Sequence, residues 1–475
     1  MDFQGIISTL LPILSKVLII GLAGLGALAL SYALYRKKGG KRKLPLKKSI
    51  TVLLLIMWFG IVMVLTTFSR GQNFEGWVNL RLFSGYLSAW HQWSLSEFQL
   101  IIFNMLMFMP LGFLIPLLGM RTRRFMPVLL TSLAVTTGIE LIQMFSRRGI
   151  FELDDILHNT IGSIAGYLIM NAILDSVKQR KLAFRSAGLA LCIPLAFVLL
   201  FTGALAVYQT KELGNLSIRP AIMQDMRGVE VELMAGLPEE AEPASLYVSD
   251  RLYNLGYGQE MAALVERSFD LQRKGGKRID GMNRVWSFAD PDGNPYTFNY
   301  NLGDGGWQLY IQGERNSAMS EEETAKHKEF YESWMRSNHI LPADAIFSIQ
   351  NGDTLRWDIS HSKAAIAENE KDFAQGMIML IPSSAGQKAP LDLFYAMNEN
   401  KYVRKVEIIS PAQAYEEVLQ GNFNMYNDLK KGDLLRIEQV ELVYTYDSKG
   451  YYQPVYNFIG TVNGEDWETQ IPAIH

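Results

Sequence analysis

The sequence predicts a bundle of six membrane-spanning helices followed by an extracellular α+β domain. All six apolar runs long enough to cross a bilayer fall within the first 208 residues. Charge divides the chain at the same point: residues 1–208 hold 20 Lys+Arg against 8 Asp+Glu, and residues 209–475 hold 25 against 40. The second half also shows short alternating strand patterns and amphipathic helices, which are typical of a water-facing domain.

The expected membrane spans are joined by loops of unequal charge. Their apolar runs cover residues 17–35, 50–67, 98–119, 126–146, 156–174 and 186–207. The loop 36–48 contains eight basic residues and no acid, and basic residues also mark loops 121–124 and 178–185. Lys and Arg stay on the cytoplasmic side. Both ends of the chain are therefore expected outside the plasma membrane of a bacterium.

These patterns give four predicted segments. They are a first helix with a basic cytoplasmic loop (1–49), a core of spans two to five (50–176), a sixth span (177–208) and an outer domain (209–475). Within the outer domain, a helix followed by antiparallel strands occurs twice. This repetition favours two modules, near 209–320 and 340–475.

Polar residues within the spans meet at one predicted depth. Asn104 and Glu140 each lie about six residues, or about 9 Å, from the outer end of their spans. Gln143 follows Glu140 on the same helix face, and Asn159 lies in the first turns of the fifth span. The same level includes residues at the mouth of the fifth span and in the preceding loop: Asp154, Asp155 and Arg148.

Two interpretations of this polar cluster remain open. It could hold the bundle together through hydrogen bonds between helices, in which case its role is purely architectural. Alternatively, it forms an outward-opening cleft that binds a lipid head group or another polar ligand, because a carboxylic acid beneath the interface is costly unless paired or protonated.

The same residues resemble the VanZ-like family. The stretches NMLMFMPLGF (104–113) and IELIQMFSRRGIFELDDILHNTIGSIAGYL (139–168) show its order of asparagine, F-x-P-x-G, E-x-x-Q, arginine, an acidic stretch and N-T-x-G. Glu152 replaces a usual aspartate. His158 replaces an apolar residue, and we interpret it as an interfacial histidine rather than a metal ligand. Besides the polar cluster, the resemblance covers the structural positions Phe108, Pro110, Gly112, Gly162 and Gly166.

The resemblance implies a role in the cell envelope, because VanZ is associated with resistance to the glycopeptide teicoplanin. The expected partners are the bilayer and a cell-wall precursor, a lipid head group or the glycopeptide itself. A membrane protein partner is a further alternative for the outer domain. The resemblance assigns no catalytic residue.

The outer domain carries no recognisable catalytic or metal-binding motif. Its histidines lack ligand spacing, and neither an H-E-x-x-H nor a G-x-S-x-G motif occurs. We therefore expect no metal and no cofactor, and the acidic charge argues against nucleic acid. The helix 410–422 and the QPVY strand resemble, more weakly, the tail of YycI-like and PepSY-like ectodomains.

Three functions follow from these observations. The first is a non-enzymatic envelope protein that influences glycopeptide susceptibility. The second is a membrane-anchored regulator that acts through its outer domain. The third is a membrane enzyme acting on a lipid-linked envelope substrate. The sequence favours a protein that is not an enzyme.

Overall fold

The computed structural model describes residues 26, 30, 32–38, 45–68, 71, 78–311, 319–383, 389–425 and 428–474. The chain divides into two compact units, one made mainly of residues before Leu213 and the other mainly of Leu213–His475. The first unit is helical and the second is rich in strands.

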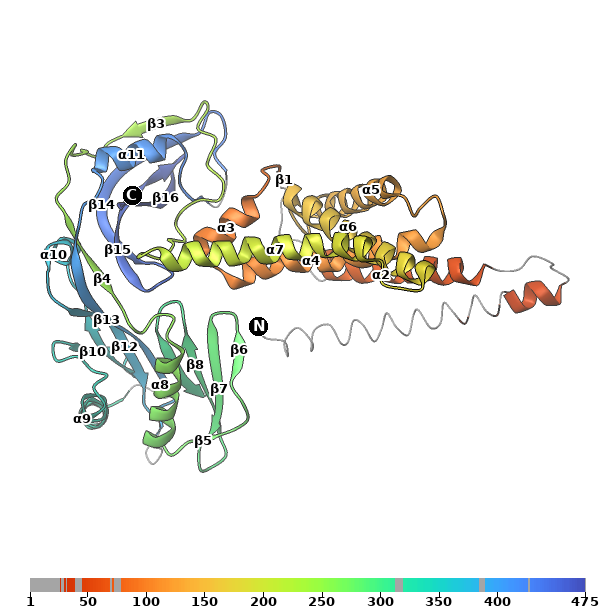
Figure 1. Ribbon diagram of the computed structural model, residues 1–475. Helices are drawn as coiled ribbons and strands as arrows, with labels where there is room; N and C mark the ends of the chain where they lie inside the picture. Colours follow the sequence, from red (N-terminus) through yellow and green to blue (C-terminus); the bar gives the residue numbers. More distant parts are fainter. Residues whose placement is uncertain are drawn as a thin grey trace. The chain divides into compact units, whose positions relative to one another are not determined.

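Among the described residues of the first unit, five helices are long and apolar enough to cross a membrane (Figure 1). They correspond to the second through sixth predicted spans, whereas most of the first predicted span, 17–35, lies outside the described residues. The chain is thus a membrane protein with a sheet-rich second part. The elements of the first unit are α2 (Leu46–Met63) with η1 (Val64–Phe68), β1 (Val78–Asn79), α3 (Ser84–Gln92), α4 (Leu95–Leu114) with η2 (Ile115–Leu118), α5 (Phe125–Phe145), β2 (Phe151–Glu152), α6 (Leu153–Gln179) and α7 (Phe184–Thr210).

Helices α4 and α6 pack closely because small residues face each other. A Cβ added at Gly112 would lie 1.7 Å from the Ser163 carbonyl oxygen, and one at Gly162 would lie 2.0 Å from the Met105 carbonyl oxygen. Small residues are what allow two membrane helices to approach to this distance. Beside this contact, Phe108 is fully buried and meets the edge of Trp58 at 5.4 Å between ring centroids. The α4–α6 contact is therefore made largely by backbone.

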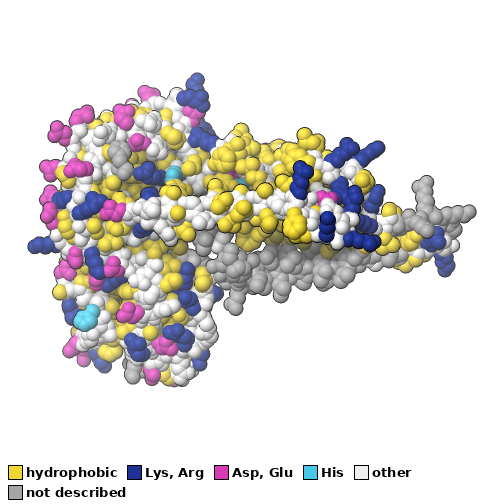
Figure 2. Space-filling model, viewed as in Figure 1, with side chains coloured by type: hydrophobic (Ala, Val, Ile, Leu, Met, Phe, Trp, Pro, Cys, Tyr) yellow, Lys and Arg dark blue, Asp and Glu magenta, His cyan; other side chains and the backbone are white. Residues whose placement is uncertain are grey.

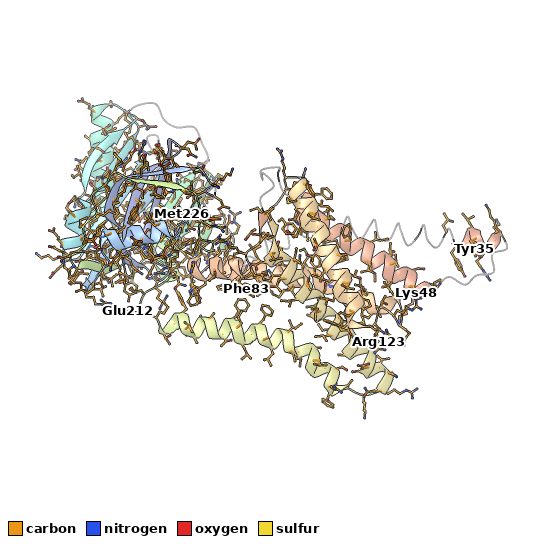
Figure 3. All side chains as sticks on the ribbon, turned by 90° about the horizontal axis from the view of Figure 1, so that it is seen from above. Tyr35, Lys48, Phe83, Arg123, Glu212 and Met226 are labelled. Atoms are coloured by element: carbon orange, nitrogen blue, oxygen red, sulfur yellow. The ribbon has the colours of Figure 1, made fainter. Side chains whose placement is uncertain are left out.

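The two ends of the membrane helices differ in charge. In Figure 3, Lys48 and Arg123 lie at one end of the bundle and Phe83 lies at the other. Figure 2 shows the Lys and Arg side chains of the helices gathered at that first end. There the Arg123 guanidinium pairs with Asp175 at 2.6 Å, and Asp175 also accepts from Ser186 at 2.6 Å. This network ties the start of α5 to the end of α6 and the start of α7.

Antiparallel strands form the framework of the second unit. The nine-strand path of its sheet runs β3-β14-β15-β4-β13-β9-β8-β7-β5, with β10, β11, β12, β16 and β6 attached to it. The strands are β3 (Glu230–Leu233), β4 (Ala244–Val248), β5 (Gln272–Arg273), β6 (Arg278–Asp280), β7 (Asn283–Ala289), β8 (Pro295–Asn301), β9 (Trp307–Ile311), β10 (Ile346–Gln350), β11 (Thr354–Ile359), β12 (Phe373–Ile381), β13 (Asp392–Val406), β14 (Leu434–Tyr446), β15 (Tyr451–Val462) and β16 (Glu465–Pro472). The helices are α8 (Leu255–Ser268), α9 (Glu321–Ser337), α10 (Lys363–Glu368) and α11 (Pro411–Leu419).

Local sequence signals explain the main hairpins and helix starts of this unit. The turn PDGN separates the paired strands β7 and β8, and the DSKG and NG turns separate β14, β15 and β16. Ser320 and Ser410 each form a capping box at the start of α9 and α11. The predicted helix within 410–422 is confirmed as α11.

Strand β13 serves two hydrophobic cores. Its first half pairs with β9 and β12, and its second half pairs with β4. One core is rich in aromatic side chains and includes Trp307, Trp357 and Tyr395, and the other surrounds Phe423 and Trp467. The first core draws on strands from both sides of residues 320–340. The division into two modules at that point stays a prediction.

Candidate functional site

Helix α6 begins at the centre of the predicted polar cluster. Asp155, in its first turn, accepts a hydrogen bond from the Asn104 amide of α4 at 2.6 Å. One turn further, the Asn159 amide donates to the Thr136 hydroxyl of α5 at 2.8 Å, and Asn159 is only 3% exposed. Asn104 and Asp155, both predicted from their depth, are thus in direct contact. Asn159, the third, is hydrogen-bonded to the neighbouring helix α5.

The Glu140 carboxyl group of α5 lies deep in the protein. It is 1% exposed and accepts from the Glu152 backbone amide at 3.3 Å, just before α6 begins. Gln143, one turn along α5, is 3% exposed. A buried carboxyl group in a membrane helix is costly and is usually found at a functional position.

The turn between α5 and α6 keeps these groups together. Arg147 adopts a left-handed conformation, with φ of +57°, and the Arg148 amide donates back to the Gln143 carbonyl at 2.9 Å. A left-handed residue ends a helix in this way, although glycine is the usual choice. The Arg148 guanidinium reaches the Phe68 carbonyl oxygen at 3.4 Å. The short strands β1 and β2 then pair in parallel through Val78–Phe151 and Asn79–Glu152.

Asp154 makes contacts that the sequence analysis did not anticipate. Its two carboxylate oxygens accept from the backbone amides of Phe83 at 2.6 Å and Gly85 at 2.8 Å, and the Ser84 hydroxyl lies 3.3 Å away. These amides belong to the first turn of α3, where a helix has unsatisfied donors. Asp154 therefore caps a helix that lies about 70 residues earlier in the chain.

His158, which the sequence analysis interpreted as an interfacial histidine, is buried within the protein. Its side chain is 2% exposed, and its ring meets the edge of Tyr86 of α3 at 5.2 Å between centroids. Helix α3 covers this position, since Asp154 holds the start of α3 one turn before His158 on the same face of α6. Among the described residues, no group of three or more His, Cys, Asp or Glu could hold a metal ion.

The structure adds residues that the sequence analysis missed. Thr136 precedes Glu140 by four residues, so the helical period was a signal that could have found it. The sequence already places Ser163 on nearly the same side as Asn159, and the structure adds that its hydroxyl donates to the Phe108 carbonyl oxygen at 3.2 Å. The α3 amides that Asp154 caps carried no signal, because a backbone donor has no sequence signature.

The structural positions predicted from the family pattern lie at the α4–α6 contact. Gly112, Gly162 and Gly166 all face backbone of the other helix at distances that exclude a Cβ. Pro110 stands inside α4, and Phe108 fills the centre of the apolar cluster. These positions therefore determine how closely the two helices approach.

Residues 50–174 match the family model described as VanZ/LLP1. This match confirms the predicted VanZ-like core. No curated protein matches the chain.

Two solved structures resemble the chain weakly. The Bacillus megaterium YpeB C-terminal domain is 11% identical with a TM-score of 0.22, covering 46% of this chain and 93% of that chain. An uncharacterized protein from Eubacterium rectale is 9% identical with a TM-score of 0.20, covering 51% of this chain and 86% of that chain. Scores this low say nothing about what the second unit does.

Proposed function

We propose that this membrane protein acts in the bacterial cell envelope and lowers susceptibility to the glycopeptide teicoplanin. The polar cluster at the end of the bundle, defined as Asn104, Glu140, Gln143, Arg148, Asp154, Asp155 and Asn159, would be its working part. The match of residues 50–174 to the VanZ/LLP1 family supports this proposal.

The buried Glu140 carboxyl group carries the proposal. An architectural hydrogen bond between membrane helices contributes on average less than about 1 kcal/mol, whereas burying an ionisable group at this depth costs several times that amount. Glu140 is nevertheless 1% exposed. We infer that it serves a ligand or a proton, because packing alone would be better served by an apolar residue.

The expected topology agrees with this role. Lys48 and Arg123, from the two expected cytoplasmic loops, lie at the end of the bundle opposite Phe83, and loops rich in Lys and Arg remain on the cytoplasmic side. With that orientation, the polar cluster lies in the outer leaflet of the plasma membrane. The C-terminal domain lies outside the cell. Cell-wall precursors and glycopeptides meet on this side.

Teicoplanin susceptibility tests the proposal in a susceptible Gram-positive host. The host would express wild type, Glu140→Gln, Asn159→Ala or Glu97→Gln, with membrane abundance measured by immunoblot. Glu97→Gln is the matched control, because it removes a carboxylate near the start of α4 whose side chain makes no hydrogen bond among the described residues. We expect wild type and Glu97→Gln to protect, and the other two variants to lose protection at equal abundance.

Two results would contradict the proposal. If wild type gives no protection, the VanZ-like core does not act on this antibiotic in that host. If Glu140→Gln protects as well as wild type, the buried carboxyl group is architectural. Deletion of residues 209–475 tests a further possibility, regulation through the outer domain. Loss of protection by that deletion alone would favour it.

A further inference from the structure

Helix α3 is attached to the start of α6 through one carboxylate. Asp154 accepts from the backbone amides of Phe83 at 2.6 Å and Gly85 at 2.8 Å. Only two of the nine residues of α3 are buried. An element with few buried contacts opens at a lower free-energy cost than the core of a protein. Loss of the Asp154 contacts would therefore favour release of α3.

Bulky residues in the left-handed conformation flank α3 at both ends. Phe83 has a φ of +68°, and Trp93 has a φ of +46°. Bulky side chains rarely adopt this conformation, and it persists only where surrounding contacts hold it. Because the Phe83 amide is one of the two that Asp154 holds, release of that contact also relaxes the backbone at Phe83. These two positions are suited to act as hinges.

The His158 imidazole lies beneath α3 without a hydrogen-bond partner. Its side chain is 2% exposed, the Tyr86 ring meets it at 5.2 Å between centroids, and neither ring nitrogen has a partner among the described residues. A neutral imidazole has one donor and one acceptor, and an imidazolium has two donors. Unpaired buried groups of this kind are destabilising. Water would satisfy both nitrogens if α3 moved away.

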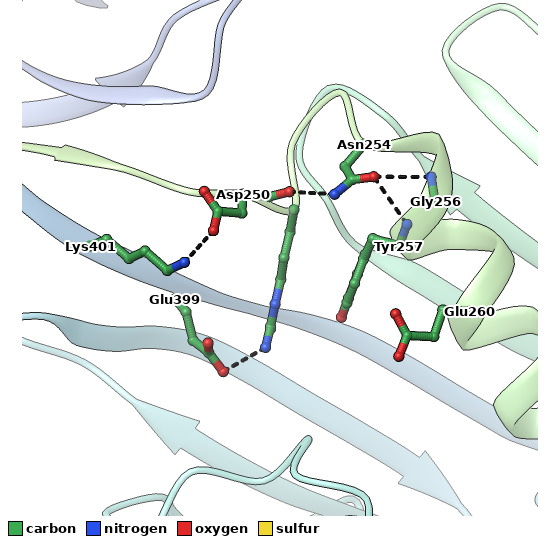
Figure 4. Close-up of a pocket in the computed structure, with 8 residues that line it drawn as sticks. Asp250, Asn254, Gly256, Tyr257, Glu260, Glu399 and Lys401 are labelled. Carbon is green, nitrogen blue, oxygen red and sulfur yellow. Dashed lines mark hydrogen bonds and ion pairs between the residues drawn. The ribbon is translucent and has the colours of Figure 1, made fainter.

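His158 differs in this respect from charged groups of the strand-rich unit. A pocket of about 430 Å³ there is lined by side chains that pair with one another (Figure 4), Arg251 with Glu399 and Lys401 with Asp250. These pairs are complete in the arrangement that the structure shows. The His158 nitrogens gain their hydrogen bonds only in a different arrangement of the chain.

Asp154 is the charged group best placed to receive a protonated His158. It lies four residues before His158 on the same face of α6, where side chains are neighbours. Burial, and to a smaller extent the charge of Asp154, raises the pKa of the Tyr86 hydroxyl to about 12, so Tyr86 remains neutral. Other titratable groups on the elements around this position are His91, Glu97, Glu140, Glu152, Asp155 and Lys211.

We propose that α3 is a pH-sensitive lid that opens when His158 takes up a proton. The proton comes from water and binds the ring nitrogen that carries none. Asp154 then accepts from the imidazolium N–H and gives up the Phe83 and Gly85 amides, which turn to water. Because Asp154 belongs to the polar cluster, this inference deepens the proposed function and rests on it for the site that the lid covers. Acid on that side of the membrane would uncover the cluster.

Proton linkage gives the size of the effect. With α3 closed, His158 stays neutral, and with α3 open it titrates as an exposed histidine does, at about pH 6.5. The open state therefore binds more protons, and the closed state loses stability as the pH falls through that value. Between about pH 7.5 and about pH 5.5, the ratio of open to closed protein is expected to rise about tenfold.

Hydrogen exchange of the full-length protein in nanodiscs, followed by mass spectrometry at both pH values, tests the lid. Each observed rate is divided by the intrinsic rate at the same pH, so that only opening is compared. We expect this normalised exchange of residues 83–89 in wild type to be about tenfold faster at the lower pH. His158→Phe keeps a ring beneath Tyr86 but cannot take up a proton, so its exchange should stay slow at both. His327→Phe in α9 is the matched control and should respond as wild type does.

Equal normalised exchange of wild type at the two pH values would overturn the proposal. A folded His158→Phe protein that responds to pH as wild type does would overturn it as well. Thermal melting at about pH 7.5 shows whether this variant is folded, and His158→Leu supplies a second side chain that cannot titrate if it is not. The teicoplanin assay of Glu140→Gln is independent of these rates, so the lid and the proposed function can fail separately.

Discussion

Helix α6 is joined to α4 and to α5 by opposite means. Against α4 it presents Gly162, Ser163 and Gly166, and the two backbones approach until a Cβ has no room. Against α5 it presents Asn159, whose side chain reaches the Thr136 hydroxyl. One contact depends on the absence of side chains and the other on a specific pair of them. In the VanZ-like pattern, the glycines therefore serve helix packing, whereas the polar side chains are available for chemistry.

The largest expected effect lies at the backbone contact. Gly112→Ala would place a Cβ 1.7 Å from the Ser163 carbonyl oxygen, which is backbone and cannot rotate away. We expect a loss of about 3 kcal/mol of stability, seen as a lower melting temperature in detergent and lower membrane abundance. Gly138→Ala in α5 is the control, because nothing lies within 4 Å of its added Cβ. Equal stability of the two variants would contradict the close α4–α6 approach.

A smaller effect is expected where α6 holds α3. Asp154→Ala removes the acceptor for the Phe83 and Gly85 amides, at a cost of about 2 kcal/mol to the docking of α3. Hydrogen exchange should therefore speed up at those two amides by more than about tenfold, while exchange in the middle of α4 stays slow.

Asp154→Asn sharpens that measurement, because it keeps one acceptor oxygen and removes the charge. We expect exchange rates between those of wild type and the alanine variant. Unchanged exchange in both variants would mean that the cap does not hold α3 in place.

The smallest effect concerns the side-chain contact between α6 and α5. A double-mutant cycle of Asn159→Leu and Thr136→Val isolates their hydrogen bond, and we expect a coupling energy of about 0.6 kcal/mol. Reversible unfolding in mixed micelles measures it. A coupling above about 2 kcal/mol would make this contact as structural as the glycine contact, and the comparison between the two sides of α6 would fail.

The sequence predicted helices and strands better than it predicted which residues contact one another. Five spans and the hairpins of the second unit follow from apolar length, alternation and turn residues, all of which are local properties. The polar cluster was also predicted from depth, and two of its members, Asn104 and Asp155, are joined by a hydrogen bond. By contrast, the capping of α3 by Asp154 and the burial of His158 beneath Tyr86 were not predicted.

By itself, the sequence determined that this chain is a membrane protein and that Gly162 and Gly166 mark a close helix contact, and it predicted one depth for the polar residues. Only the tertiary structure decided that α4 is the helix in that contact, that the Thr136 hydroxyl accepts from Asn159, and that Asp154 caps α3. The reason is physical. Length and periodicity act along a single segment, whereas the choice between two buried partners depends on which backbone donors and hydroxyl groups other segments bring within hydrogen-bond distance.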